Sequence, residues 1–304
     1  MSETEIQQSH QEHLCPECAG KNSQPQLEQL IYAIGTLEAR FPTIGIEREF
    51  HQRELALQMK QELPAARGKR IATVLRENTH LCSRVCFILS VGNTPAYIVA
   101  PSSQSTLHRM LEAVSHSGTP GAFVVLIGRR VGTAGPGQCG GLLAPIVVCD
   151  QLYPFTLDEW LHELEARVEH VIKAGGKSSD HFATVAREFF TRVAQSTENI
   201  GALDSHRALN YVVVQHPGMA LSVAERPGAV LDRVETRAVQ GTDLRRIVAI
   251  ILTFVDRKTG VAERLFCRVD VTEEWPFLID GAEPGAPALG LTPYIENALS
   301  GAVY

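Results

Sequence analysis

The sequence lacks the features that mark membrane proteins and nucleic-acid-binding proteins. Its longest apolar runs, Ile247 to Val255 and Phe123 to Ile127, have the length of strands and are too short for a membrane-spanning helix. Lysine and arginine total 28 against 34 aspartate and glutamate residues, so the formal net charge is -6. Nonspecific nucleic-acid binding depends on clustered positive charge, which is missing here. We therefore expect neither a membrane nor a nucleic acid among the partners.

A secretory signal is also missing, because Met1 to His13 are polar and acidic with no apolar core. This predicts a cytoplasmic protein. In that compartment, 7 cysteines in 304 residues are more typical of metal ligands and buried thiols than of a disulfide framework. Cys149 follows an apolar run and Cys267 shares the apolar face of an alternating pattern, so both are expected to be buried thiols.

Motifs of common enzyme classes are absent as well. The glycine-rich stretch 132–141 has neither the Gly-Lys-Ser/Thr ending of a phosphate loop nor the spacing of a dinucleotide fingerprint. His162-Glu163 begins like a zinc-protease helix, but Ala166 stands where the second histidine is required. A Gly-x-Ser-x-Gly elbow does not occur. The sequence leaves enzymatic activity open and favours a non-catalytic protein without a protease triad.

The most informative feature that is present is Cys15-Pro16-Glu17-Cys18, because two thiolates at this spacing form half of a tetrahedral zinc site. The remaining thiolates are expected among Cys82, Cys86 and Cys139. Four protein ligands leave no position for water or substrate, so the predicted zinc is structural and attaches the N-terminal arm to the rest of the fold.

Two combinations could complete this site. Cys82 and Cys86 lie four residues apart and would share one face of a helix. Cys139 lies among glycines, whose backbone amides can approach a thiolate sulfur and stabilise its charge. We favour Cys86 with Cys139 and keep Cys82 as the alternative ligand.

The chain is predicted to comprise a flexible arm (1–26), one globular domain (27–280) and a tail rich in Gly, Pro and Ala (281–304). Strands and helices are mixed without regular alternation, which predicts an α+β (mixed α/β) fold with a largely antiparallel sheet and helices packed on it. The predicted strands are 30–37, 85–91, 96–99, 122–131, 143–149, 246–255 and 264–271. The predicted helices begin near Pro42, in 75–84, and after Ser105, Thr156 and Asp180, with a helical section to about Glu225.

A cluster of hydrogen-bonding side chains extends from Asp204 to Tyr211. On a helix, His206 and Asn210 share one face, and Arg207 shares another with Tyr211. Period-two alternation in the last predicted strand places Arg264, Arg268 and Asp270 on its outer face. We interpret Asp204, His206, Arg207, Asn210, Arg268 and Asp270 as a buried polar network or, alternatively, a binding or acid–base site.

Several segments, in order along the chain, resemble one family. They are Tyr32-Ala33-Ile34-Gly35 with Arg40-Phe41-Pro42; Cys139 through Gly141-Leu142 to Pro145-Ile146-Val147-Val148 with Asp150-Gln151; His206-Arg207-Ala208-Leu209-Asn210-Tyr211; and Arg268-Val269-Asp270-Val271-Thr272-Glu273-Glu274 with Pro276-Phe277-Leu278. This family is the C-terminal domain of unknown function of the cyanobactin maturation proteases, the PatA/PatG-type domain. The resemblance implies cysteines at the positions of Cys86 and Cys139 but not at Cys82.

The resemblance further implies a role in the maturation of ribosomally synthesised, post-translationally modified peptides. In the family the domain lies behind a subtilisin-like protease or macrocyclase domain, whose Asp, His and Ser segments this chain lacks. The resemblance also implies a zinc-binding homodimer. We therefore expect a zinc-stapled accessory protein whose partner is a precursor peptide or a maturation enzyme. The alternatives are an enzyme with a site around Asp204, His206, Arg207 and Asp270, and a structural dimerisation module.

Overall fold

The computed structural model describes residues 29–60, 62–174, 179–194, 196–224, 226, 229–239, 244–279 and 291–294. The predicted arm at 1–26 and most of the predicted tail at 281–304 lie outside these residues. The chain divides into two compact units, Met1–Thr156 and Leu157–Tyr304. The single domain expected over 27–280 stays a prediction.

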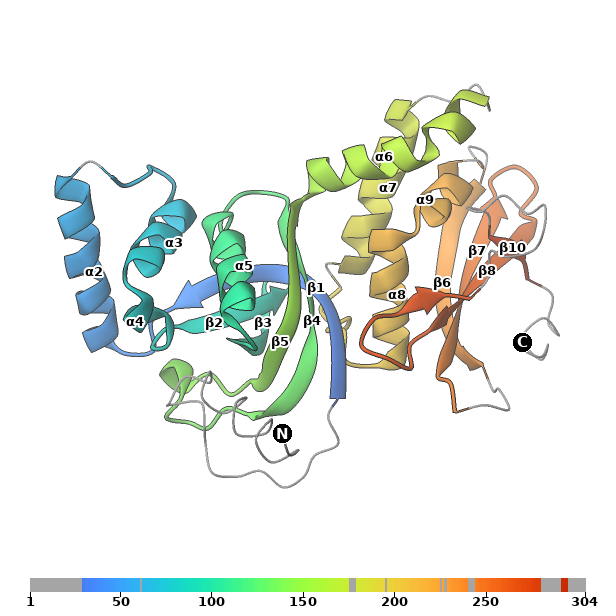
Figure 1. Cartoon of the computed structure of the whole chain (residues 1–304). Coiled ribbons are helices and arrows are strands. Elements are labelled where there is room, and N and C mark those ends of the chain that lie inside the picture. The colour runs from blue at the N-terminus through green and yellow to red at the C-terminus, as the bar shows by residue number, and fades with distance from the viewer. Residues whose placement is uncertain are drawn as a thin grey trace. The chain divides into compact units, whose positions relative to one another are not determined.

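The first unit is a closed five-stranded barrel with the strand order β1-β2-β3-β5-β4 (Figure 1). Its elements are β1 (Gln29–Arg40), α2 (Ile44–Met59), α3 (Arg67–Glu77), α4 (Thr79–Cys82), β2 (Cys86–Val91), β3 (Thr94–Pro101), α5 (Gln104–Ser115), β4 (Ala122–Thr133), the 3-10 turn η1 (Cys139–Gly141) and β5 (Pro145–Thr156). Neighbouring strands are antiparallel except β3 and β5, which are parallel. This order, with a helix between the third and fourth strands, is that of an OB-type barrel.

Strand β1 closes the barrel by changing partners along its length. Residues Gln29 to Gly35 pair with β4, and Thr36 to Arg40 pair with β2. Gly35 lies at this change, where an added Cβ atom would come within 2.4 Å of the carbonyl oxygen of Ser90. Only a residue without a side chain permits this close approach of β1 and β2.

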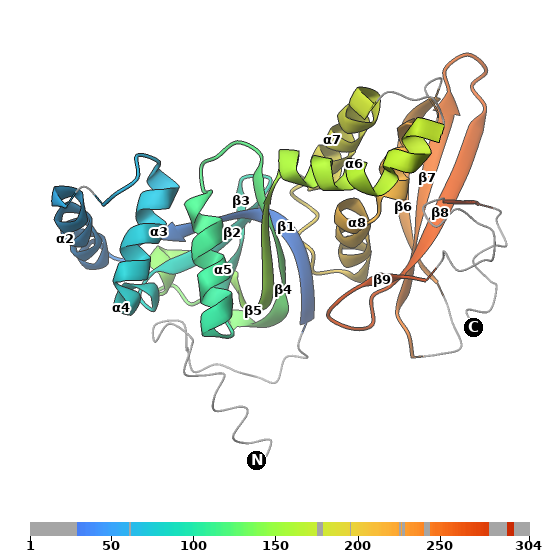
Figure 2. The same cartoon turned by 45° about the horizontal axis from the view of Figure 1, so that its top comes forward.

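The second unit packs helices against an antiparallel sheet of order β10-β8-β7-β6, with β9 also paired to β8. Its elements are α6 (Leu157–Ala174), α7 (Ser179–Ala194), α8 (Asp204–Gln215), α9 (Pro217–Ala224), β6 (Ala229–Val239), β7 (Ile247–Asp256), β8 (Ala262–Asp270), β9 (Phe277–Leu278) and β10 (Thr292–Pro293). Helices α7, α8 and α9 lie on one face of the sheet (Figures 1 and 2). Trp160 joins α6 to α8, because its indole nitrogen donates to the carbonyl of Val214 at 3.1 Å.

The mixed α/β class with antiparallel-rich sheets and packed helices is confirmed. The predicted strands 85–91 and 96–99 form the antiparallel pair β2–β3, and 246–255 and 264–271 form β7–β8. The helix predicted after Ser105 is α5, which has Ser103 as its N-cap. Strand β6 is not among the predicted strands. Helix α2, predicted to begin near Pro42, buries only part of its apolar side chains. Ile46 and Phe50 are buried, but Leu55 and Met59 are 60% and 87% exposed. No helix within the described ranges is both long enough and apolar enough to cross a membrane.

Candidate functional site

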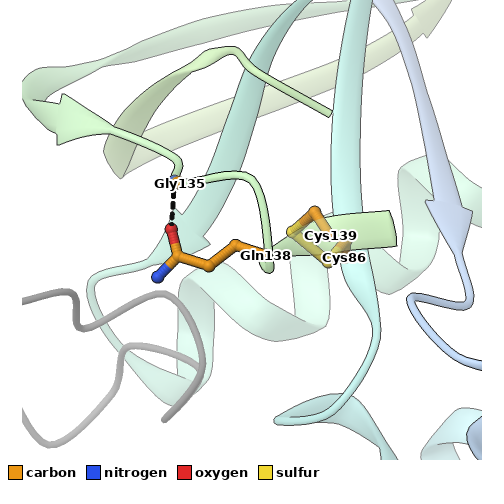
Figure 3. Close-up of a disulfide and its surroundings, with 4 residues drawn as sticks. All are labelled: Cys86, Gly135, Gln138 and Cys139. Atoms are coloured by element: carbon orange, nitrogen blue, oxygen red, sulfur yellow. Dashed lines mark hydrogen bonds between the residues drawn. A yellow bond between two sulfur atoms is a disulfide. The ribbon is translucent and has the colours of Figure 1, made fainter. Parts of the chain in front are cut away.

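Cys86 and Cys139, two of the four predicted zinc ligands, are joined to each other in a disulfide (Figure 3). Their Cα atoms are 5.7 Å apart, and 53 positions separate them in the sequence. Cys86 begins β2, whereas Cys139 opens the 3-10 turn in the loop between β4 and β5. The structure therefore brings these two residues together, as sequence reasoning expected, but as a disulfide and not as two thiolates.

The loop that carries Cys139 has an unusual backbone. Cys139 has φ 45°, and Gly140 and Gly141 follow with φ 69° and 85°. Glycine adopts a left-handed backbone readily, whereas a residue with a Cβ atom has a higher conformational energy there. Cys139 is therefore held in a strained conformation. The side-chain oxygen of Gln138 accepts a hydrogen bond from the backbone N–H of Gly135 at 2.7 Å, which closes the turn before it (Figure 3).

This loop covers an apolar patch on the outside of the barrel. Cys86 and Ile88 lie in register with Arg40 and Glu38 of β1, whose side chains are 45% and 40% exposed, so these positions of β2 face outward. They nevertheless pack in one buried cluster with residues of β3, β5 and the loop: Ile98, Ile146, Ala134, Cys139 and Ala144. In an OB-type barrel this face of the second and third strands, with the loop between the fourth and fifth, is the usual ligand face. Here the loop occupies that face.

Only two of the four predicted zinc ligands, Cys86 and Cys139, lie among the described residues. Cys15 and Cys18 lie outside the described residues, and among the described residues no group of three or more His, Cys, Asp or Glu side chains is placed to hold a metal ion. After reduction, Cys86 and Cys139 would supply two adjacent thiolates, which suits half of a four-cysteine site. The ligand set therefore stays a prediction.

Cys82, the alternative ligand, lies elsewhere in the same unit. Its thiol donates to the carbonyl of Leu75 in α3 at 3.3 Å. Burial raises the pKa of Cys82 to about 11, so it keeps its proton at neutral pH and is a poor metal ligand in this state. Cys149 and Cys267, expected as buried thiols, are buried as predicted.

Arg207 is the centre of the predicted polar cluster. Its side chain is 1% exposed, and its guanidinium donates to backbone carbonyls of the turn after β8: Val271 at 2.6 Å, Glu274 at 3.3 Å, and Glu273. Burial, followed by the nearby charge of Arg246, lowers the pKa of Arg207 to about 10, so it remains charged at neutral pH. This residue fastens α8 to the sheet by satisfying three carbonyls at once.

The two carboxylates of the cluster also have structural partners. Asp204 pairs with Arg246 at 3.0 Å and with Arg207 at 3.6 Å. Asp270 accepts from Arg245 at 2.6 Å and from the backbone N–H of Thr272 at 2.8 Å. Burial raises the pKa of Asp270, but the hydrogen bonds from Thr272 and Arg245 outweigh it, and the net pKa lies below the usual value. An ionised, hydrogen-bonded Asp270 is unsuited to act as a general acid.

The other predicted members lie on α8 and β8. Asn210 accepts a hydrogen bond from the side-chain amide of Asn199 at 2.6 Å, which ties α8 to the turn after α7. Arg268 lies by register on the outer face of β8, beside Ala249. Burial lowers the pKa of His206, and its Nδ1 atom is buried without a hydrogen-bond partner among the described residues. The contacts described for the cluster thus fasten α8 at several places, to the turn after α7, to the turn after β8 and to Arg246.

Sequence reasoning missed several partners of this cluster. Arg245 and Arg246 lie directly before β7, where Arg245 binds Asp270 and Arg246 binds Asp204. The backbone N–H of Thr272 donates to Asp270, and the hydroxyl oxygen of Thr272 accepts from the backbone N–H of Arg246. The sequence signal for these ion pairs was the arginine pair directly before one strand, together with the carboxylates at the end of the next strand.

Comparisons with known proteins find two similarities, one to a family and one to a solved structure. The model of the family "PatG C-terminal" matches residues 176–283. A solved structure described as the PatG domain of unknown function has 18% sequence identity and a TM-score of 0.63, covering 82% of this chain and 96% of that one. No curated protein matches the sequence.

These findings define a fold that is similar to that of a PatG domain of unknown function. At 18% identity the solved structure establishes the fold alone. The family match places a PatG C-terminal-type domain in this chain, over residues 176–283. The predicted resemblance is therefore confirmed.

Proposed function

We propose that this protein is a non-catalytic accessory protein in the maturation of ribosomally synthesised, post-translationally modified peptides, in a cyanobactin-like pathway. It binds a precursor peptide or a maturation enzyme in the cytoplasm. The match to a PatG C-terminal-type domain supports the pathway. The state of the polar cluster supports a non-catalytic role.

The observation that carries this proposal is the engagement of the charged side chains around α8. Arg207 donates to three carbonyls, Asp204 pairs with Arg246, and Asp270 is held by Arg245 and Thr272. Groups so engaged hold structure together and are not free to bind substrate or exchange protons during a reaction. A protein that only binds a partner does not need free acid–base groups at this place, so these contacts are compatible with a binding role.

The test is binding by the full chain. Calorimetry with the precursor peptides and maturation enzymes encoded beside it should give saturable binding to at least one of them. Mass spectrometry of the same mixtures should find the peptide unchanged. Absence of binding to all of them would contradict the proposal.

Structural zinc and self-association belong to the same proposal. Cys15, Cys18, Cys86 and Cys139 would hold the ion in the reduced protein, which forms a homodimer. Metal analysis after purification under reducing conditions should find about one zinc per chain, since four thiolates complete one tetrahedral site. The variant Cys139→Ser should lose it, whereas Cys267→Ser should keep it. The mass in solution, measured by light scattering, tests the dimer.

One observation favours the alternative of an enzyme. The Nδ1 atom of His206 is buried without a partner among the described residues, and burial lowers its pKa, so a neutral imidazole with a free acceptor is available. If His206→Ala abolished a chemical change in the peptide while the fold and the binding persisted, this alternative would replace the accessory role.

A further inference from the structure

Strand β6 forms one edge of the second-unit sheet (Figure 2). Among the strands that the structure describes, β6 pairs with β7 alone. Backbone N–H and C=O groups alternate between the two sides of a strand, so about half of those on β6 point away from β7. A strand with such an edge can continue its sheet by pairing with a further strand. The outer edge of β6 is therefore a candidate surface for association.

Only part of this edge is open to pairing. A β-bulge lies between Leu231 and Arg233, and Arg192 of α7 donates to the carbonyls of Leu231 at 3.3 Å and Asp232 at 3.4 Å. Bulges and occupied carbonyls interrupt the pairing of an edge strand. Residues 233–239 follow in unbroken register with β7 and make no other backbone hydrogen bond within the described part of the chain. We call residues 233–239 the β6 edge.

Charged side chains of the β6 edge reach the surface. On one face of the strand, the side chains of Arg233 and Arg237 are 65% and 49% exposed, and that of Glu235 between them is 26% exposed. By contrast, Ala249 and Ile251 of the neighbouring β7 are both 0% exposed. The part of this sheet that a partner can reach is therefore its edge at β6, and not the face over β7.

The charges of the β6 edge are complementary to those of a second copy. When two identical strands pair antiparallel about a two-fold axis, the axis passes through one position, and residues equally far from it on either side lie opposite each other. Charges alternate in sign along one face, in the order Arg233, Glu235, Arg237. With the axis at Thr236, each Glu235 lies opposite the Arg237 of the other copy, and Thr236 lies opposite itself. Opposite charges and paired threonines both stabilise neighbouring strands.

Other positions of the axis fit less well. An axis at Glu235 sets two carboxylates against each other and Arg233 against Arg237, and an axis at Arg237 sets two guanidinium groups against each other. Like charges directly opposite are destabilising. An axis at Val234 opposes unlike charges, but it extends the pairing to Asp232, which lies in the bulge. The sequence of β6 therefore selects the register centred on Thr236.

We propose that two copies of this chain associate by antiparallel pairing of their β6 edges about a two-fold axis at Thr236. The two sheets then form one, in the order β10-β8-β7-β6-β6-β7-β8-β10, with the helices of both copies on the same face. This inference rests on the homodimer in the proposed function and names its surface. An edge of this length buries less area than a permanent interface, so the dimer should dissociate on dilution.

Cysteine crosslinking tests the position of the axis. In Thr236→Cys the two introduced residues lie directly opposite each other, with Cα atoms about 4.5 to 5.5 Å apart, which a disulfide can span. Oxidised glutathione should therefore join two chains of this variant, with release of reduced glutathione. Arg233→Cys is the matched control, because its two copies would lie about 20 Å apart along the edge. A non-reducing gel should show a covalent dimer for Thr236→Cys and, for Arg233→Cys, no more of it than for the unchanged protein.

Charge reversal tests the pairing of Glu235 with Arg237. Glu235→Arg places like charges opposite each other at two symmetric positions, so the dissociation constant of the dimer should rise by about tenfold or more. Light scattering over a dilution series measures this constant. The swapped variant Glu235→Arg with Arg237→Glu restores opposite charges and should regain the original value. Glu112→Arg, at an exposed position of α5, is the control and should leave the constant unchanged.

The outcomes separate this surface from the proposed function. If light scattering finds a dimer but Thr236→Cys crosslinks no more than Arg233→Cys, or Glu235→Arg leaves the dissociation constant unchanged, the β6 edge is wrong and the homodimer stands. If the unchanged protein is a monomer over the whole dilution series, both are wrong, and the accessory role is decided separately by calorimetry. A monomer whose affinity for the precursor peptide falls in Glu235→Arg would assign the edge to a peptide strand and likewise overturn the proposal.

Discussion

Arg207 of α8 donates a hydrogen bond to the carbonyl of Val271, 2.6 Å away, and so joins a helix to the turn that follows β8. The same guanidinium bonds Glu273 and Glu274 of that turn. Two guanidinium nitrogens supply these three hydrogen bonds, and the positive charge of the group strengthens them.

Replacement of Arg207 should be strongly destabilising. Arg207→Met keeps most of the stem and removes the donors, which leaves buried carbonyls unpaired and should lower the free energy of unfolding by about 3 kcal/mol. Urea denaturation measures this change. Arg187→Met, at an exposed helix position, is the control and should stay within about 0.5 kcal/mol of the unchanged protein. A near-neutral Arg207→Met would show that the three carbonyls find water instead.

His216 should make stability depend on pH. It is buried after α8, its Nδ1 accepts from the N–H of Gly218 at 3.3 Å, and burial lowers its pKa from 6.5 to about 4. A lowered folded-state pKa means that the unfolded chain binds the proton first. The stabilisation is therefore complete above pH 6.5 and is lost as the pH falls to about 4, by about 3 kcal/mol.

The variant His216→Gln keeps a hydrogen-bond acceptor and cannot titrate. Its free energy of unfolding, measured by urea between pH 7 and pH 4.5, should fall less steeply than that of the unchanged protein. His108→Gln, at an exposed position of α5, should keep the original slope. Identical slopes for all three proteins would show that His216 is solvated or already charged in the folded state.

Gly35 should be irreplaceable in the barrel. A Cβ atom there would lie 2.4 Å from the carbonyl oxygen of Ser90, so Gly35→Ala forces β1 and β2 apart at the point where β1 changes partners. We expect a loss of about 3 kcal/mol. Gly132→Ala is the matched control, because nothing lies within 4 Å of its added Cβ atom. Equal melting temperatures for the two variants would contradict the close approach.

Reduction of the Cys86–Cys139 disulfide should loosen the loop over the barrel. A crosslink across 53 positions restricts the unfolded chain, which corresponds to about 4 kcal/mol in the chain-entropy account. A dithiol reductant with a chelator should therefore lower the melting temperature and expose the apolar patch of Ile88, Ile98 and Ile146 to a hydrophobic dye. Under the zinc proposal, reductant with zinc should preserve the melting temperature. An unchanged melting temperature with reductant and chelator would show that the loop is held by packing alone.

Helices and strands with a clear local signal, such as a turn or a cap residue, were predicted correctly from the sequence. The apolar run of β7 and the partly alternating β8 flank a turn at Asp256 to Gly260, and α5 follows a serine cap. Strand β6 was missed because a β-bulge between Leu231 and Arg233 breaks its period-two pattern. The proximity of Cys86 and Cys139 was predicted through their expected role as ligands, but sequence cannot distinguish a thiolate pair from a disulfide.

The partners of Arg207 illustrate a second limit. Arg207 binds backbone carbonyls of residues more than 60 positions away, and backbone groups carry no signature in the sequence. The polar cluster was therefore recognised as a set of residue types, whereas its division into separate contacts depended on tertiary structure.

The accessory role is tested most directly by calorimetry of the full chain with the precursor peptide, followed by mass analysis of that peptide. The account predicts saturable binding, an unchanged peptide mass and the same affinity in His206→Ala. A peptide whose mass changes in the presence of this protein alone, with the change abolished in His206→Ala, would contradict it.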